Sequence, residues 1–403
     1  MKCWLIVAFS FFTLTATLAS EPATEAIRFP LMAWDYADDK ATFEAMRDCC
    51  VTSVAFVPIK ALDLCHEANL EAIVFDERLS GARYHGPFDG DTVRQNLPEI
   101  LKEVGDHPAV LGYHLRDEPS PEQYPDLAKG VAAIRELAPG KWPYVNLLPG
   151  DGPGYDKYVE DFVKICNPTV LSYDRYTTVE KDVFYPVFWT NLAVMREAAL
   201  KHKLPFWNVV LTAPHWSYRD LTDADLRMEI YGSLVYGAKG IGFYKFMSCS
   251  LPILEAPDLG NFRNAPLDQF GEKTPTWHML RNINRQVHNL APVLLKLESN
   301  DVYHIGDAVP ERNHGPSETS LVKNVPNGEF IVGDFTHSEN GKRYVMIVNR
   351  SMTASHACVP EFRTPPSKVN YISPITGKSE PYLAWAYYLA PGQGVLLELE
   401  PEA

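Results

Sequence analysis

The sequence predicts an α/β protein with a (β/α)₈ TIM barrel followed by a C-terminal all-β sandwich domain. Between residues 29 and 297, eight short apolar runs alternate with eight stretches at helical spacing, the pattern of a closed parallel barrel. From residue 299 onwards, short alternating runs are separated by turn dipeptides such as Asn327-Gly328, which is typical of antiparallel sheets. No GxGxxG or GxxxxGK[ST] motif follows any expected strand, so the sequence lacks the signature of a nucleotide-binding sheet.

The expected elements follow one another in strict alternation. The barrel strands are expected at residues 29–35, 51–57, 71–75, 110–117, 142–148, 170–174, 205–212 and 240–246. The helices are expected at residues 40–50, 61–68, 91–104, 124–137, 155–166, 187–202, 223–236 and 276–297. In the sandwich domain, strands are expected at residues 330–335, 344–349, 368–372 and 394–399.

The N-terminal segment has the three parts of a signal peptide. Lys2 supplies a positive charge, residues 5–18 are apolar, and small residues at positions 17–20 suit cleavage. We therefore expect a signal peptide at 1–20, a barrel at 21–298 and a sandwich domain at 299–403, in a secreted or periplasmic protein. No later segment reaches membrane-spanning length, so no membrane partner is expected after signal removal.

The net charge and the cysteine content limit the kinds of ligand and partner that the protein is expected to bind. The 403-residue chain has a formal net charge of -14, which argues against nucleic acid as a partner. Its seven cysteines show no CxxC or zinc-type spacing, and we expect no metal and no cofactor. After loss of Cys3, a disulfide from Cys49 or Cys50 to Cys65 is the nearest candidate pairing in an oxidising compartment.

One expected strand ends in two adjacent carboxylates. Residues 110–117 are followed directly by Glu118 and Pro119, so the strand delivers Asp117 and Glu118 to its C-terminal tip. Proline blocks further ladder pairing, and this end of a barrel strand is where TIM-barrel enzymes place their catalytic groups. An Asp-Glu pair at this point indicates a catalytic site.

Other polar and aromatic residues are expected at the same mouth, because the C-terminal ends of all eight strands converge there. As candidate substrate-binding residues we place there Trp34, Asp35, Asp76, Asn146, Tyr173, His215, Trp216, Tyr244 and Lys245. A mouth lined by carboxylates and aromatic rings suits the hydrolysis of glycosides. That reaction needs one carboxyl group to protonate the departing oxygen and a second group to stabilise charge at the anomeric carbon.

Glu118 is the candidate general acid. An ionised Asp117 beside it raises the pKa of the Glu118 carboxyl, because two adjacent negative charges repel each other. The alternative is structural, with Asp117 capping the next helix and Glu118 solvated in a loop. Asp174, at the end of the sixth strand, is the third catalytic candidate, either as a nucleophile or as a base for water; its alternative is to hold Arg175 or Lys245. Glu255, in the loop after the eighth strand, is expected at the surface.

The chain resembles the clan of retaining barrel glycosidases that includes family 42. The passage at residues 227–241 is similar to the stretch before the last barrel strand in those enzymes, and residues 345–350 and 391–394 resemble their β-domains. The resemblance implies a glycoside hydrolase with Glu118 as acid/base. The clan normally has Asn where this chain has Asp117, and a nucleophilic Glu at the end of strand seven, where this chain reads Thr212-Ala213-Pro214.

The Asp117-Glu118 pair also resembles that of glycosidase families 20 and 123, in which the substrate's own N-acetyl group is the nucleophile. That resemblance implies that Asp117 orients the acetamido group and Glu118 acts as acid/base. Tyr173-Asp174 resembles a Tyr-Asp of family 18 chitinases, which implies that Tyr173 donates to the acetamido oxygen. Three interpretations stay open: a glycosidase of the general type, a substrate-assisted β-N-acetylhexosaminidase, and a carbohydrate-binding barrel without catalysis.

Overall fold

The computed structural model describes residues 28–80, 87–150, 152–180, 183–248 and 261–401. The predicted signal peptide lies outside these residues, as do Cys249 and Glu255. Within the described part of the chain, no helix is both long enough and apolar enough to cross a membrane.

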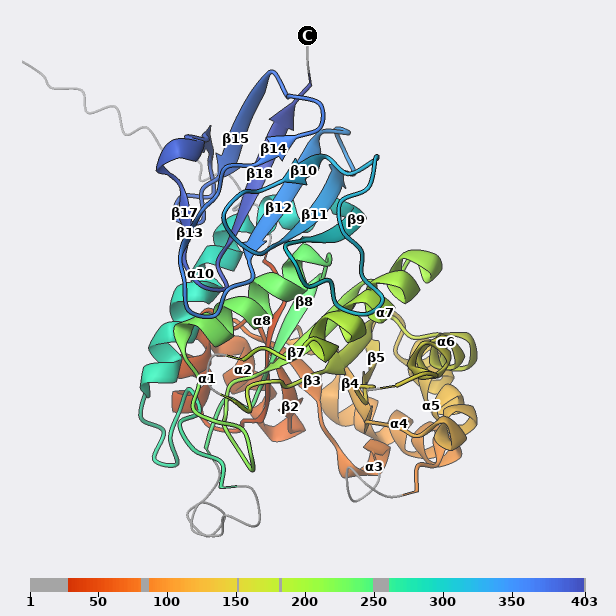
Figure 1. Ribbon diagram of the computed structural model, residues 1–403. Helices are drawn as coiled ribbons and strands as arrows, with labels where there is room; N and C mark the ends of the chain where they lie inside the picture. The colour runs from red at the N-terminus through yellow and green to blue at the C-terminus, as the bar shows by residue number, and fades with distance from the viewer. Residues whose placement is uncertain (1–27, 81–86, 151, 181–182, 249–260, 402–403) are drawn as a thin grey trace, which may run out of the picture.

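The first eight strands form a closed parallel barrel in sequence order, from β1 next to β2 round to β8 next to β1. Helices surround these strands on the outside (Figure 1). The predicted barrel is therefore confirmed. Its strands are β1 (Leu31–Tyr36), β2 (Ser53–Val57), β3 (Glu71–Val74), β4 (Val110–Asp117), β5 (Trp142–Leu147), β6 (Leu171–Asp174), β7 (Phe206–Leu211) and β8 (Gly240–Tyr244).

The helices α1, α4 and α8 begin at polar residues whose side chains cap free amide groups. Asp39 accepts a hydrogen bond from the Thr42 amide at the start of α1, and Thr222 forms a capping box with Asp225 at the start of α8. The helices are α1 (Lys40–Asp48), α2 (Leu62–Glu67), α3 (Glu77–Ser80), α4 (Gly90–Val104), α5 (Tyr124–Leu137), α6 (Tyr155–Cys166), α7 (Val187–His202), α8 (Asp223–Val235) and α10 (Pro275–Leu294).

The last barrel helix is shorter than predicted. We expected it to reach residue 297, but α10 ends at Leu294 and the next strand begins at Leu297. The Lys239 ammonium group donates hydrogen bonds to the carbonyl oxygens of Leu294 at 2.8 Å and Leu297 at 2.6 Å. This half-buried cation caps the end of the helix and so marks the turn from helix to strand.

Large side chains fill the barrel interior. Trp34, Phe56, Tyr144 and Trp207 belong to a separate buried cluster inside the ring of strands. Close packing there requires glycine on neighbouring strands, since a Cβ atom at Gly240 would lie 2.4 Å from the Trp207 ring. The interior is therefore a packed core rather than a pore. Aromatic side chains fill the space beneath the polar residues at the strand ends.

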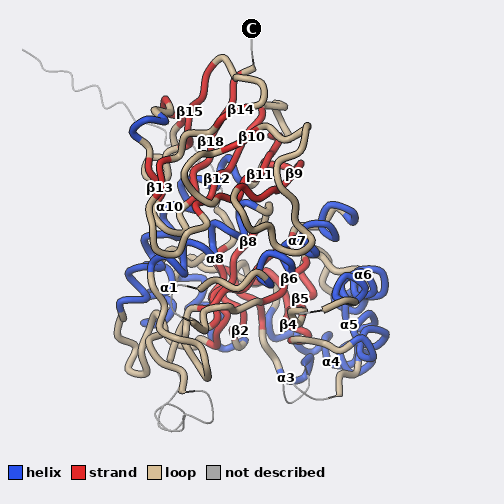
Figure 2. The backbone as a smooth tube through the Cα atoms, in the orientation of Figure 1, coloured by secondary structure: helices blue, strands red, loops and turns tan. Residues whose placement is uncertain are grey.

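The C-terminal region is antiparallel, as predicted. Its main sheet has the order β16-β15-β18-β12-β11-β9, with two small sheets, β10-β14 and β13-β17, beside it. Figure 2 shows its strands as a second group, separate from the barrel. The strands are β9 (Leu297–Ile305), β10 (Val322–Asn324), β11 (Phe330–His337), β12 (Arg343–Asn349), β13 (His356–Ala357), β14 (Glu361–Phe362), β15 (Lys368–Ile372), β16 (Ser379–Pro381), β17 (Tyr388–Leu389) and β18 (Gly394–Glu400).

The sheet packs closely against the barrel helix α8. A Cβ atom at Gly333 of β11 would lie 2.4 Å from the Val235 carbonyl oxygen, so glycine is needed for this approach. Ile331, Met346 and Leu396 of the sheet belong to the same buried cluster as the barrel's outer core. The two parts of the chain therefore share one hydrophobic core.

The disulfide that we considered between Cys49 or Cys50 and Cys65 is not formed. The five cysteines in the described residues are free, and four of these, Cys49, Cys65, Cys166 and Cys358, are buried in hydrophobic cores. Burial raises the pKa of the Cys65 thiol to about 12. These side chains therefore act as small apolar packing groups.

Candidate active site

A cavity of about 440 Å³ opens at the C-terminal ends of the barrel strands. This is the end at which the sequence placed the candidate residues, and the walls combine carboxyl groups with aromatic rings. The residues that line it are Trp34, Asp117, Glu118, Asn146, Pro149, Asp174, Arg175, Tyr176, His215, Trp216, Tyr218 and Tyr244.

An irregularity in β4 aims its end into the cavity. The pairing of β4 with β5 shifts register between His114 and Arg116, as a β-bulge with one extra residue does. His114 packs inside the barrel, 4.9 Å from the Phe56 ring, and Asp117 lines the cavity. Residues three apart on a regular strand would face opposite sides, so the extra residue lets both side chains point inwards.

Glu118 has a backbone conformation that few non-glycine residues adopt. Its φ angle is 44°, which lies in the left-handed region. Its amide donates to the Asn146 carbonyl oxygen at 2.8 Å, and the carbonyl oxygen of the next residue, Pro119, accepts from the Tyr158 hydroxyl at 2.9 Å. These bonds on both sides hold Glu118 in a costly conformation, a feature that clusters at functional sites.

Asn146 links two of the carboxyl groups. Its Nδ2 atom donates to Asp174 Oδ1 at 2.8 Å and to Asp117 Oδ1 at 3.3 Å. Burial, and next the charge of Glu118, raises the pKa of Asp117 to about 7. Burial, followed by the charges of Glu118 and Asp117, raises the pKa of Asp174 well above its usual range. Both shifts favour the protonated form of the carboxyl group.

Aromatic rings also line the cavity. Tyr176 stacks on Tyr244 with ring centroids 5.5 Å apart, and Phe262 stacks on His215 at 4.5 Å. His215 is buried and its Nδ1 lies 2.8 Å from the Ala213 carbonyl oxygen. Since a carbonyl only accepts, the proton sits on Nδ1. Trp216 is 67% exposed, so its ring face is open to a ligand in the cavity.

Asp35 and Lys245, two predicted binding residues, do not line the cavity. Lys245 Nζ lies 3.4 Å from Asp35 Oδ1, and Asp35 Oδ2 accepts from the Met247 amide at 2.7 Å. The pair joins the ends of β1 and β8, the strands at which the barrel closes. Burial raises the pKa of Asp35, although Lys245 opposes this shift. The pair connects the two strand ends, and its predicted role in substrate binding stays a prediction.

Asp76, another predicted binding residue, forms an ion pair with Arg78. Both of its oxygens accept from the Arg78 guanidinium, at 2.9 and 2.7 Å, and Arg78 binds Glu103 as well. Burial raises the pKa of Asp76, but its hydrogen bonds with Arg78 outweigh burial and the pKa lies below its usual value. The charge of Asp76 is thus neutralised by Arg78, and Asp76 is not among the residues that line the cavity; its predicted role in substrate binding stays a prediction.

Tyr173 points away from the cavity. It is fully buried in the layer between the strands and the helices, whereas Ser172 and Asp174 on either side bond to Asn146. Side chains alternate along a strand, so Tyr173 and Asp174 cannot both face the interior. The predicted hydrogen bond from Tyr173 to a substrate is therefore not supported by this geometry.

The sequence interpretation missed four lining residues. These are Pro149, Arg175, Tyr176 and Tyr218. Arg175 and Tyr176 follow Asp174 directly, and Tyr218 lies two positions after Trp216. The sequence could therefore have indicated these residues only by their closeness along the chain to predicted site residues. Each lies beyond a strand end, where strand alternation no longer predicts direction.

The end of β7 carries no carboxylate, as the sequence indicated. Thr212 follows the strand, is fully buried and donates from its hydroxyl to the Lys245 carbonyl oxygen at 3.0 Å. Among the described residues that line the cavity, the carboxyl groups are those of Asp117, Glu118 and Asp174. The site thus differs from one with a nucleophile on strand seven.

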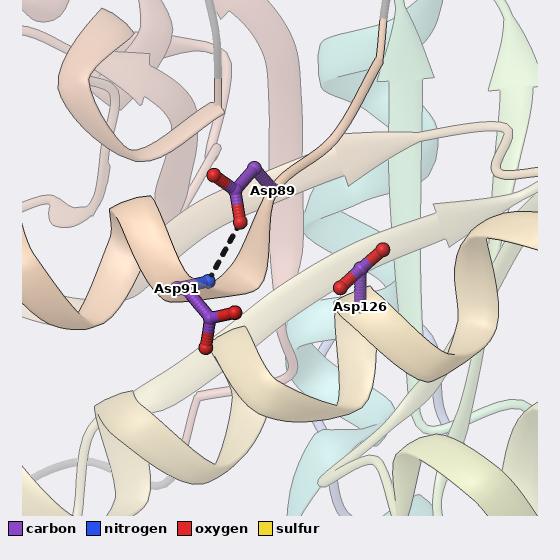
Figure 3. Close-up of side chains that lie close together, drawn as sticks. All are labelled: Asp89, Asp91 and Asp126. Atoms are coloured by element: carbon purple, nitrogen blue, oxygen red, sulfur yellow. Dashed lines mark hydrogen bonds between the residues drawn. The ribbon is translucent and has the colours of Figure 1, made fainter.

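A second group of carboxylates lies away from the cavity. Figure 3 shows Asp89 and Asp91 at the start of α4, near Asp126 on the neighbouring α5. Lys129 lies 2.9 Å from both Asp91 and Asp126, and Asp89 Oδ1 accepts from the Asp91 amide. An ammonium group and a helix cap account for these charges, so the group joins two helices.

No protein-family model matches the sequence, and no curated protein matches it. Solved structures do match. One described as "Glycoside hydrolase" has a TM-score of 0.59 at 12% identity, with 92% of each chain covered. A GH5_18 from Streptomyces cattleya, in complex with GlcNAc, has a TM-score of 0.50 at 12% identity over 64% of this chain and 80% of its own. A GH5_18 from Bifidobacterium longum subsp. infantis has the same score and identity over 64% and 79%. These matches establish the fold.

Proposed function

We propose that the protein is a glycoside hydrolase that cleaves O-glycosidic bonds in oligo- or polysaccharides. The observation that carries the proposal is the convergence of Asp117, Glu118 and Asp174 in one cavity with exposed aromatic rings. Glycoside hydrolysis uses two carboxyl groups, and aromatic faces offer flat apolar surface to a sugar ring. That the solved structures with this fold include glycoside hydrolases agrees with the proposal.

In this reaction Glu118 is the proton donor. Its partly exposed side chain lines the cavity, and the bonds around its backbone hold the residue in one conformation. Glu118 protonates the oxygen of the departing group as the glycosidic bond breaks. It then takes a proton from the water that completes the reaction in a retaining or substrate-assisted route. In an inverting route, Asp174 takes the proton from water instead.

The absence of a carboxylate at the end of β7 favours substrate assistance as the more specific candidate. In that route the acetamido oxygen of the substrate attacks the anomeric carbon, and Asp117, next to Glu118, orients the acetamido nitrogen. The Asp117 carboxyl is held by the Asn146 amide at 3.3 Å, which fixes its direction. We propose a β-N-acetylhexosaminidase on this basis.

A panel of nitrophenyl glycosides tests both levels of the proposal. Glu118→Gln should lower the hydrolysis rate by about 10² to 10⁴, the usual contribution of a general acid. Glu122→Gln is the matched control, because Glu122 is exposed four positions later and should keep full activity. Hydrolysis of N-acetylhexosaminides but not of plain hexosides selects the substrate-assisted route, and the reverse pattern excludes it.

The rival interpretation is a barrel that binds carbohydrate without cleaving it. The missing β7 carboxylate motivates this reading as well. If the wild type cleaves no glycoside or polysaccharide, and Glu118→Gln binds sugars as tightly as the wild type does, the enzyme proposal fails and the binding interpretation takes its place.

A further inference from the structure

A buried chain of hydrogen bonds lies beneath the carboxyl groups of the cavity. Tyr144 and Ser172 are fully buried and Asn146 is 2% exposed. The Tyr144 hydroxyl and Ser172 Oγ are 2.7 Å apart, and Ser172 Oγ donates to Asn146 Oδ1 at 2.9 Å. This series of hydrogen bonds starts at Tyr144 in the barrel interior and ends at Asp117 and Asp174.

The chemistry of these groups sets the direction of every bond. Asn146 Oδ1 can only accept, so the single Ser172 hydroxyl hydrogen points to it. Ser172 Oγ therefore accepts from Tyr144. The Tyr144 hydroxyl thus has Ser172 Oγ as its acceptor, at 2.7 Å.

The direction of these hydrogen bonds corresponds to one orientation of the Asn146 amide. With Oδ1 occupied by Ser172, the NH₂ group faces the cavity and gives one hydrogen to Asp174 and one to Asp117. A flipped amide would turn its oxygen towards two carboxyl groups and remove both donors. The bonds from Tyr144 to Ser172 and from Ser172 to Asn146 thus stabilise the amide in the orientation that serves both aspartates.

We propose that Tyr144, Ser172 and Asn146 form a positioning relay that makes Oδ1 of both Asp117 and Asp174 an acceptor and leaves Oδ2 of each to carry a proton or meet the substrate. The proposal rests on the proposed function and deepens it, since it assigns the proton-bearing atoms of the site. Tyr144 and Ser172 touch neither substrate nor reacting atoms, so they act through Asn146.

The charged and titratable surroundings of the two aspartates agree with this assignment. The titratable groups that interact electrostatically with them are Arg116 in β4 and Glu118 after it, Tyr144 from β5, Tyr155 and Tyr158 from α6, and Tyr173, Arg175 and Tyr176 on or after β6. Burial raises the pKa of both aspartates, while the Asn146 hydrogen bond lowers it. Loss of the ordered amide should therefore raise both pKa values further.

The test is Tyr144→Phe, with Ser172→Ala as a second variant. Each should lower kcat about tenfold, the effect of one lost buried hydrogen bond, and leave KM within about twofold. The alkaline limb of the pH–rate profile should move to higher pH. Tyr303→Phe is the matched control, because it removes another buried tyrosine hydroxyl, bonded to Asp334 at 3.1 Å in the C-terminal sheet, and should leave the profile unchanged.

A second measurement does not depend on activity. Infrared titration of the carboxylic acid C=O band, assigned with Asp117→Asn and Asp174→Asn, should show deprotonation at higher pH in Tyr144→Phe than in the wild type. An unchanged titration and pH profile in both relay variants would overturn the relay, even if Glu118→Gln is inactive and the enzyme proposal holds. If the wild type hydrolyses nothing, the enzyme proposal fails while the infrared result still decides on the relay.

Discussion

Replacing Asp117 by Asn should stabilise the protein, by an amount that depends on pH. Burial and the nearby Glu118 raise the pKa of Asp117 from 3.8 to about 7. One pKa unit corresponds to about 1.4 kcal/mol, so an ionised Asp117 costs roughly 4 kcal/mol of folding free energy above pH 8. Asn keeps an oxygen that accepts from Asn146 and never ionises.

The sign follows from proton binding. Between about pH 4 and pH 7 the folded state holds a proton on Asp117 that the unfolded chain has released. The contribution of this group to the free energy of unfolding therefore falls as pH rises through that window and is constant above it. Asp117→Asn lacks this loss, so its advantage over the wild type should be small at pH 4, grow towards pH 7 and then level off.

Denaturant unfolding at several pH values measures the difference. Asp76→Asn provides an opposite control, because hydrogen bonds with Arg78 outweigh burial and lower the pKa of Asp76. That variant should be less stable than the wild type at pH 7, with the deficit disappearing as pH falls below about 4. A stability gap between Asp117→Asn and the wild type that stays constant from pH 4 to pH 8 would refute the reasoning.

Three further changes have defined outcomes. Gly112→Ala should destabilise the barrel by about 1–3 kcal/mol or more, since its Cβ would lie 2.3 Å from the Trp142 carbonyl oxygen; Gly152→Ala, with no atom within 4 Å, should be neutral in the same unfolding assay. Arg219→Ala should cost about 3–5 kcal/mol, because it leaves Asp225, whose side chain is 1% exposed, without its partner at 2.7 Å; equal losses in Arg47→Ala, at a surface pair, would contradict this. Trp216→Ala should raise KM for a sugar substrate roughly tenfold with the melting temperature unchanged, and an unchanged KM would exclude stacking on this ring.

Much of the fold could be predicted because the barrel's signals are local. Apolar runs, helix caps and turn dipeptides each depend on a few neighbouring residues, and the described strands match the expected ones within a few positions. The end of α10 could not be predicted in this way. It depends on Lys239, which reaches it from the start of β8, far away in the sequence.

The positions of the candidate site residues likewise depend partly on neighbouring residues and partly on contacts that are distant in the sequence. Asp117 and Asp174 line the cavity because they end strands whose direction the fold sets. Tyr173 was misplaced although alternation along β6 already separates it from Asp174. Asp35 lies apart because its partner, Lys245, lies on the far side of the barrel seam, a contact that the sequence pattern does not reveal.

The bulge in β4 makes the site depend on how the strand is paired rather than on how many residues it contains. His114 and Asp117 lie on the same side only because the pairing absorbs one extra residue. With one residue fewer between them, the two side chains would be two positions apart, and regular alternation would still place both inside the barrel. A strand that kept all its residues but lost the bulge would instead turn the Asp117 carboxyl group to the helix side. Substitutions at residues 115 and 116 that favour regular pairing should therefore harm the site more than the removal of one of these residues.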